Sequence, residues 1–438
     1  MGREHSMAAH PMMRFGLRWH GASGLGARRL GACLLGACLL AGCPGARPAA
    51  PAATPVTTEV GGPVHGLAGD GASLVATLAG HVTSRGAHVW SVALAPAQDP
   101  APGPANPATA PSPGALAMGD GLVYAAASAK LRGDPGAIVV GLDASSGAER
   151  WRLPIDATGW SLITSVAPFD RAHGGGVVVG GSFQGTLRAA NTVVESAGQT
   201  DGFVARVGKD GSLAWLVRLG GPGADAVQGV AVRGDRIAIA GTFSPAADIL
   251  GEPLASVDDQ LPFSDAFAAT LDGSGKRTWS ASWGGKLDDA VAGVAIDDRD
   301  RVVVAGTARD VVHVDAQELK AKATDAIVVW FAKSTASARL IGGADLDGAS
   351  AIVADGDHVL VAGFAGSGAF VAELAADEQI AEWQASGPGR EEIPALASVP
   401  GGFAAAIAHT AALTFDGATL PAPADPMAGA ALVVRPLR

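Results

Sequence analysis

The fold is decided by the stretch Asp201 to Phe243, DGFVARVGKDGSLAWLVRLGGPGADAVQGVAVRGDRIAIAGTF, because it returns further along the chain. Residues Asp265 to Thr307 read DAFAATLDGSGKRTWSASWGGKLDDAVAGVAIDDRDRVVVAGT. Both stretches contain, in one order, an Asp, an apolar run, a Gly-rich turn, a Trp, a Gly-Gly pair, a second Asp and two further apolar runs. Such a period is typical of repeat architectures, in which each unit buries its apolar face only against its neighbours.

The apolar strand that opens this unit occurs seven times. Its copies begin at Gly66, Ala115, Ser165, Gly229, Gly293, Ala351 and Ala395. Their spacings of 44 to 64 residues suit a unit of four short strands, and the 61 Gly of the chain, spread among Val and Ala alternations, suit many turns. The sequence therefore predicts an all-β fold, a seven-bladed β-propeller of four-stranded antiparallel blades.

A Trp marks the predicted fourth strand of four units, at Trp151, Trp215, Trp279 and Trp383. The first unit is less regular, because it runs into a Pro-rich stretch from Pro96 to Pro113, and its fourth strand stays open.

The two ends of the chain are predicted to complete one unit together. The last unit stops after a third strand at Ala431 to Arg435, whereas Thr54 to Gly62 resembles a fourth strand and precedes the first unit. Because an open seam would leave unpaired strand edges, we expect the N-terminal strand to close the seventh blade from outside.

Segment 1–42 is typical of an export signal, with Arg28 and Arg29 before an apolar run. Leu40-Ala41-Gly42-Cys43 resembles the lipobox of bacterial lipoproteins, which implies cleavage before Cys43 and acylation of its thiol. Residues 43–55 form a Pro/Ala tether, and residues 56–438 form the propeller. We expect a lipid anchor in the bacterial outer membrane, facing the cell surface or the periplasm, and a monomer.

Composition narrows the range of partners. The formal net charge of -11 argues against nucleic acid, because neutralising phosphates needs a basic face. Cys33 and Cys38 fall within the export signal, so neither is expected to form a disulfide or a metal site in the mature protein.

Two family resemblances follow from the units. Gly181-Ser182-Phe183 with Asp201-Gly202-Phe203, repeated at Gly241-Thr242-Phe243 with Asp265-Ala266-Phe267, resembles the bacterial β-propeller repeat of SBBP type, over about residues 165–374. Leu142 to Trp151 resembles the docking motif of quinoprotein-like propellers, which implies a Trp that packs between blades. The paired cysteines of the quinoprotein family are absent, and we expect no cofactor.

No catalytic constellation is visible, and we expect no enzyme activity, no cofactor site and no metal site. Asp-rich turns at Asp272 to Gly275, Asp297 to Asp300 and Asp345 to Gly348 admit two interpretations. Either they bind calcium, for which the distal Glu of a loop site is missing, or they are tight turns capped by Asp.

The candidate ligand face is the one that carries the connections between second and third strands and between successive units. The connections between second and third strands are long and dissimilar at 186–200, 244–264 and 310–324. Loops that vary on a rigid scaffold are where binding sites usually lie, so we expect the ligand on this face. The candidate residues on this face are Asp225, Asp289, Asp347, Asp258 and Asp259. Turn capping is the alternative interpretation of Asp225, Asp289 and Asp347.

The sequence favours a non-enzymatic, lipid-anchored module that binds or scaffolds an envelope protein or polysaccharide. One alternative is a periplasmic scaffold for outer-membrane assembly, resembling quinoprotein-like lipoproteins. A second is a propeller hydrolase or lyase whose site has not been recognised.

Overall fold

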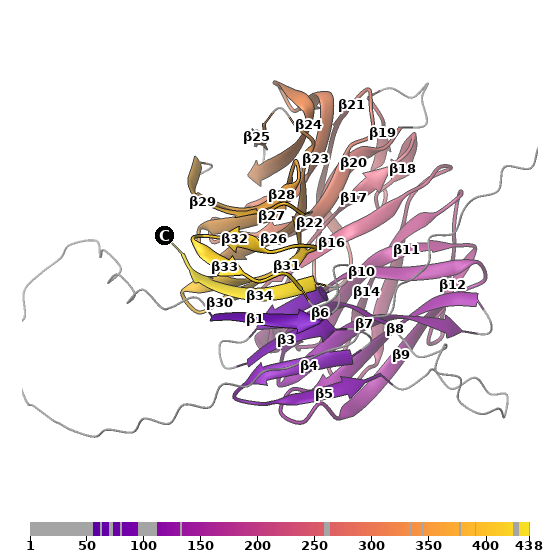
Figure 1. Ribbon diagram of the computed structural model, residues 1–438. Coiled ribbons are helices and arrows are strands. Elements are labelled where there is room, and N and C mark those ends of the chain that lie inside the picture. Colours follow the sequence, from indigo (N-terminus) through magenta and orange to yellow (C-terminus); the bar gives the residue numbers. More distant parts are fainter. Residues whose placement is uncertain are drawn as a thin grey trace, which may run out of the picture.

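The protein, seen in a computed structural model, is built almost entirely of antiparallel strands (Figure 1). The structure describes residues 56–61, 64–69, 73–78, 81–94, 112–131, 134–257, 263–332, 335–343, 345–375, 378–389, 391–423 and 429–437. Within these ranges a single 3-10 turn, η2 (Arg171–His173), interrupts the strands. These ranges include no helix that is long and apolar enough to cross a membrane.

The described strands form seven four-stranded units, called blades here and numbered along the chain from the innermost strand outward. Blade 1 consists of β2 (Val64–Gly69), β3 (Ser73–Leu78), β4 (His81–Gly86) and β5 (Trp90–Ala93). Blade 2 consists of β6 (Ser112–Gly119), β7 (Leu122–Leu131), β8 (Asp134–Asp143) and β9 (Glu149–Ala157). Blade 3 consists of β10 (Trp160–Pro168), β11 (Val177–Gln184), β14 (Asp201–Val207) and β15 (Leu213–Leu219). Blade 4 consists of β16 (Ala226–Arg233), β17 (Arg236–Phe243), β20 (Asp265–Leu271) and β21 (Arg277–Gly285).

The remaining three blades repeat the pattern. Blade 5 consists of β22 (Ala290–Ile296), β23 (Val302–Val314), β24 (Gln317–Ala332) and β25 (Thr335–Ile341). Blade 6 consists of β26 (Asp347–Asp355), β27 (His358–Ala365), β28 (Gly368–Ala375) and β29 (Glu378–Ser386). Blade 7 consists of β30 (Glu391–Val399), β31 (Gly402–His409), β34 (Gly429–Pro436) and, outermost, β1 (Val56–Gly61).

The innermost strands form a closed ring. Each of β2, β6, β10, β16, β22, β26 and β30 packs against the next, and β30 packs against β2. Every predicted unit start, from Gly66 to Ala395, lies on one of these strands. The chain is therefore a β-propeller, as the repeat predicted.

The apolar core is divided into layers between neighbouring blades. Seven buried clusters alternate with the blades, and the one formed by Leu67, Ala404 and Ala406, among others, joins blade 7 to blade 1. The middle strands are buried on both faces, as in β20, where every residue is buried. This explains why the middle strands are rich in small apolar residues, because a strand packed between two neighbouring blades has little space for large or polar side chains.

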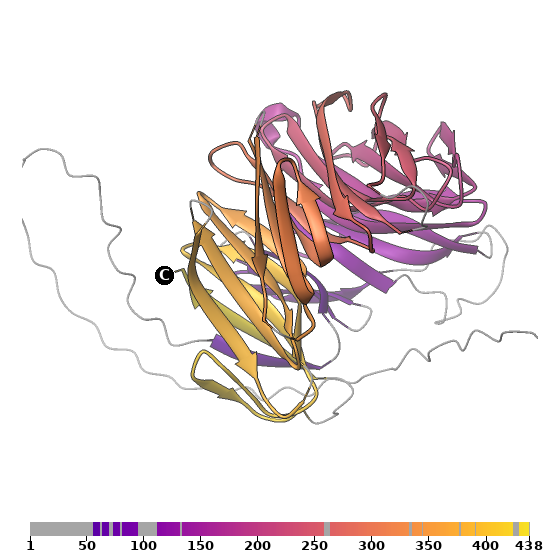
Figure 2. The same cartoon turned by 90° about the horizontal axis from the view of Figure 1, so that it is seen from above.

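The ends of the chain close the ring as predicted. β1 pairs with β34 from Val56 opposite Val434 to Gly61 opposite Gly429. Figure 1 shows the first strand in indigo beside the last in yellow, and Figure 2 shows the same pair from above.

The first blade completes the pattern that the sequence left open. Its third strand, β4, follows β3 closely, and β5 is its fourth strand and ends before the Pro-rich stretch. The Trp prediction is also confirmed, because Trp151, Trp215, Trp279 and Trp383 lie on the outermost strands β9, β15, β21 and β29.

Candidate functional site

An axial channel of about 530 Å³ runs between the seven innermost strands. Its wall is made of main chain and small or neutral side chains, with Thr164, Ser165, Gln228 and Ser350 among its polar groups. The described residues that line it include no acidic, basic or thiol side chain. The channel is therefore a neutral lumen, with hydroxyl, amide and backbone groups available for hydrogen bonding.

The long connections between second and third strands are hairpins, whereas we expected loops from the sequence. They are β12 (Thr186–Ala189) with β13 (Thr192–Glu195), β18 (Ala246–Asp248) with β19 (Pro253–Ala255), the far ends of β23 and β24, and β32 (Leu413–Phe415) with β33 (Ala418–Leu420). Strands of three or four residues are too short to show a period in the sequence, so their pairing was missed.

Each hairpin pairs with the outermost strand of the preceding blade. Leu187 lies opposite Ala157 of blade 2, and Phe415 lies opposite Ala385 of blade 6. The hairpins of blades 4 and 5 pair in the same way with the ends of β15 and β21. They therefore lock neighbouring blades together on one face of the ring, called the hairpin face here, which also carries the segments that join one blade to the next.

The backbone of each of two hairpins passes so close to the preceding blade that only glycine fits at the contact. A Cβ on Gly221 would lie 2.0 Å from the carbonyl oxygen of Ala246, and a Cβ on Gly285 would lie 2.1 Å from that of Val311. The Gly-Gly pair of the repeat is thus a close approach between two backbones, which any side chain would obstruct.

Asp225 and Asp289 lie in the interior, although we expected them to face a ligand. Asp225 is 2% exposed, and its two carboxylate oxygens accept the amides of Gly221 and Ser244. Asp289 is 3% exposed and accepts the amide of Gly285 at 2.9 Å. Turn capping is therefore the correct interpretation of both residues, because their carboxylates tie the end of one blade to the start of the next.

Burial perturbs these carboxylates. Burial raises the pKa of Asp225 to about 6, and the charge of Asp201 adds to the rise. The hydrogen bonds from the amides of Gly221 and Ser244 act in the opposite direction and lower the pKa. Burial likewise raises the pKa of Asp289 to about 7, and the nearby charges of Asp265 and Asp288 act in the same direction. Both groups titrate near neutral pH because their charged forms are poorly solvated.

The Asp347 carboxylate also caps backbone amides between two blades, but it faces a pocket. It is 2% exposed, and its carboxylate accepts the amides of Gly343 and Gly366, yet it also lines a pocket between blades 5 and 6. The candidates Asp258 and Asp259, and the lipid attachment at Cys43, lie outside the described residues.

The Trp side chains dock between blades as the quinoprotein-like motif implied. Nε1 of Trp151 donates to the carbonyl of Lys209 in blade 3 at 2.9 Å, and Nε1 of Trp215 donates to Gly273 in blade 4 at 3.0 Å. Trp90 of blade 1 makes the same contact with Ala144 of blade 2. These are structural contacts that hold successive blades at a fixed offset.

In two of the Asp-rich turns, the Asp carboxylate caps backbone amides of its own turn. Asp272 accepts the amides of Ser274 and Lys276, and the hydrogen bond from the Ser274 hydroxyl is the main reason that its pKa is lowered. Asp297 accepts the amides of Arg299 and Arg301. Across the described ranges, no group of three or more His, Cys, Asp or Glu side chains is placed to hold a metal ion.

No protein-family model matches the chain, and no curated protein matches it. Among solved structures, the quinohemoprotein alcohol dehydrogenase of Comamonas testosteroni is 12% identical, with a TM-score of 0.40 over 88% of this chain and 76% of its own. A europium-containing methanol dehydrogenase is 10% identical, with a TM-score of 0.39 over 88% of this chain and 93% of its own. PorZ, a surface component of the type-IX secretion system of Porphyromonas gingivalis, is 12% identical, with a TM-score of 0.22 over 83% of this chain and 42% of its own.

The protein is thus a β-propeller by its own sheet order and by its closed ring of inner strands. The more specific resemblance to SBBP-type repeats stays a prediction, because it rests on the sequence motifs alone.

Proposed function

We propose that the protein is a non-enzymatic binding or scaffolding module of the bacterial envelope, and that it binds its partner on the hairpin face. The observation that carries this proposal is the position of exposed apolar side chains. Of the seven large apolar side chains that are exposed among the described residues, four lie in the hairpin connections or blade-to-blade segments of that face: Val193, Val257, Leu287 and Leu346, which are 38 to 63% exposed. Apolar side chains exposed on a rigid surface are typical of protein-binding sites.

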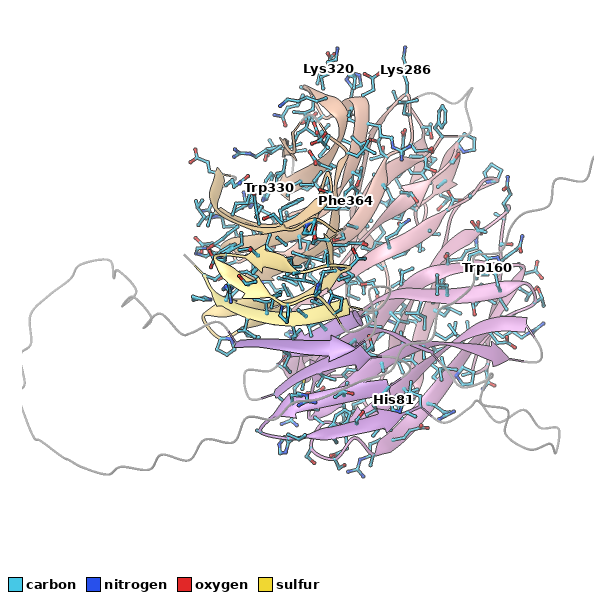
Figure 3. The ribbon with its side chains drawn as sticks, viewed as in Figure 1. His81, Trp160, Lys286, Lys320, Trp330 and Phe364 are labelled. Carbon is cyan, nitrogen blue, oxygen red and sulfur yellow. The ribbon has the colours of Figure 1, made fainter. Side chains whose placement is uncertain are left out.

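The rigidity of the face supports the same proposal. Hairpins that pair with the preceding blade hold their side chains in fixed positions, so little conformational entropy is lost when a partner binds. Basic side chains are part of this surface, since Lys286 and Lys320 project outward at the junction of blades 4 and 5 (Figure 3).

The test is capture of partners from an envelope extract by the full chain and by point variants. We expect Leu287→Asp and Val193→Asp to lose partners that the wild type retains. Val89→Asp is the matched control, because Val89 is also exposed but lies in the turn between β4 and β5, on the opposite face. Equal capture by all three variants would contradict the proposal.

The anchor is proposed separately, from the lipobox-like residues that end at Cys43. Two or three acyl chains, at about 0.8 kcal/mol per buried methylene, would hold the protein stably on a membrane. We expect Cys43→Ala to move the protein from the membrane fraction to the soluble fraction. Protease treatment of intact cells then separates the two orientations, because a surface protein is released and a periplasmic scaffold is protected.

A further inference from the structure

Blade 6 lacks the hairpin that blades 3, 4, 5 and 7 carry. Its strands β27 and β28 are joined by the two-residue turn Gly366–Ser367, with Ala365 opposite Gly368. In blades 1 and 2 the connection between the second and third strands is also short. The segments that precede their innermost strands lie outside the described residues, so these two junctions cannot be compared. At the junction between blades 5 and 6, therefore, no hairpin of the following blade pairs with the outermost strand, among the strands that the structure describes.

The Gly-Gly pair that the hairpin would cover is nevertheless present at this junction. Gly221 and Gly285 are buried beneath hairpin backbone, whereas Gly342 and Gly343 are exposed. A Cβ on Gly343 would meet a single atom within 4 Å, an oxygen of Asp347 at 3.7 Å. Among the described residues no strand pairs with the free edge of β25, which is the edge that would receive a hairpin.

An acidic pocket of about 300 Å³ occupies the vacant place. It is lined by the residues Ile341, Gly342, Gly343, Asp345, Asp347, Ala365, Phe370, Glu382 and Gln384. Three of these side chains are carboxylates, and the described lining contains no basic side chain. Phe364 lies at the end of β27, next to the turn that replaces the hairpin (Figure 3).

A buried carboxylate pair lies behind the glycine wall of this pocket. Asp325 is 3% exposed, and its Oδ1 has no hydrogen-bond partner. A Cβ on Gly342 would lie 2.5 Å from that oxygen and 2.7 Å from Oδ2 of Asp347, so both oxygens converge on one point. Within the described part of the chain, no ion pair joins either carboxylate to a basic side chain.

At the junction of blades 3 and 4, a guanidinium lies beside the equivalent pair, Asp201 and Asp225. There Asp201, the equivalent of Asp325, forms an ion pair with Arg218 at 2.7 Å. Arg218 lies opposite Phe203 in blade 3, and the equivalent position in blade 5, opposite Ile327, is Leu340. The guanidinium that compensates the carboxylates in one junction is thus replaced by an apolar side chain in the other.

An exposed apolar side chain stands next to the pocket. Leu346, 63% exposed, lies between Asp345 and Asp347 in the chain. An acidic pocket beside a free strand edge and an exposed apolar side chain is complementary to an extended peptide with alternating basic and apolar residues.

We propose that this gap binds an extended segment of a partner protein, which pairs with the edge of β25 and places an Arg or Lys side chain in the acidic pocket. The segment takes the place that the protein's own hairpins occupy in blades 4 and 5. This proposal rests on the binding function proposed above and names the chemistry of the partner.

The test uses a labelled hexapeptide of alternating Arg and Val, titrated into the full chain and followed by fluorescence anisotropy. We expect saturable binding that Asp345→Lys weakens at least tenfold. Glu378→Lys is the matched control, because it makes the same charge change at an exposed position of β29 outside the pocket. A hexapeptide of alternating Glu and Val should not bind. A variant in which residues 309–320, the hairpin end of blade 5, replace Gly366–Ser367 should not bind the Arg–Val peptide.

Three results would overturn the proposal: no saturable binding of the Arg–Val peptide, equal weakening by Asp345→Lys and Glu378→Lys, or calcium alone raising the melting temperature through Asp345 without peptide binding. The last result would assign the pocket to a metal ion. The binding function would survive such a failure if Leu287→Asp lost a partner that Asp345→Lys retained.

Discussion

Replacing Asp289 by Asn should remove much of the pH dependence of stability between pH 5 and 8. Asp289 is buried between blades 4 and 5, where its carboxylate accepts the amide of Gly285. Burial raises its pKa from 3.8 to about 7, with Asp265 and Asp288 adding to the rise. A raised pKa means that the folded protein binds the proton more tightly than the unfolded chain. This contribution to stability is complete below about pH 3.8 and is lost as the pH rises through about 7.

The magnitude follows from the two pKa values. Between pH 5 and pH 8, Asp289 alone should lower the free energy of unfolding by about 2 to 3 kcal/mol. Asp225, with a pKa of about 6, should add a smaller loss of about 1 kcal/mol over the same range. An Asn at position 289 keeps an oxygen to accept the Gly285 amide and carries no charge at either pH, so the larger loss should disappear.

Urea unfolding followed by Trp fluorescence at pH 5, 6.5 and 8 measures this difference. Asp272→Asn is the matched control, because Asp272 lies in a turn and is only partly buried, its pKa is lowered, and it stays ionised throughout the range. We expect the wild type and Asp272→Asn to lose stability in parallel as the pH rises, and Asp289→Asn to lose less. If the stability of Asp289→Asn fell with rising pH in parallel with that of the wild type, Asp289 would not be the cause of the loss.

Three further predictions concern the packing of the ring. A chain that begins at Pro63 lacks β1 and should melt several degrees below one that begins at Pro51, because the outer edge of β34 loses its partner; equal melting temperatures would refute the closure. Gly285→Ala should lower the free energy of unfolding by roughly 1 to 3 kcal/mol, because its Cβ would meet the backbone of Val311. Gly343→Ala should change it by no more than about 0.5 kcal/mol in urea unfolding. Equal effects would mean that another segment covers Gly343 as the hairpin covers Gly285. Trp215→Phe keeps an aromatic ring but loses the hydrogen bond to Gly273, so it should cost about 1 kcal/mol, and an unchanged unfolding midpoint would argue against the docking contact.

The repeat predicted the ring because each signal in it has a direct physical cause. The unit starts are the innermost strands, the Trp residues dock between blades, and the N-terminal strand closes blade 7, since all three follow from burying apolar strands against neighbours. These features are local in sequence or repeat at a fixed period, so one chain is enough to show them.

The features that the sequence did not predict depend on contacts between distant short segments. The strands of β18 and β19 have three residues each, and nothing in their composition shows that Asp248 will pair with Gly220 of the preceding blade. Asp225 is buried where it accepts the amide of Ser244, just before that hairpin, and so its burial was missed as well. The gap at blade 6 did have a signal, because Gly342 and Gly343 keep the Gly-Gly pair while the second connection shrinks to Gly366–Ser367.

We propose that partners bind the hairpin face and not the axial channel or the opposite face. Photo-crosslinking in the cells that make the protein tests it most directly, with a photoreactive side chain placed at Leu346 or Val193 on the hairpin face, at Gln228 in the channel, or at Val89 on the opposite face. We expect Leu346 and Val193 each to yield a crosslinked partner, and Gln228 and Val89 to yield none. Adducts at Gln228 or Val89, with none at Leu346 and Val193, would contradict this proposal.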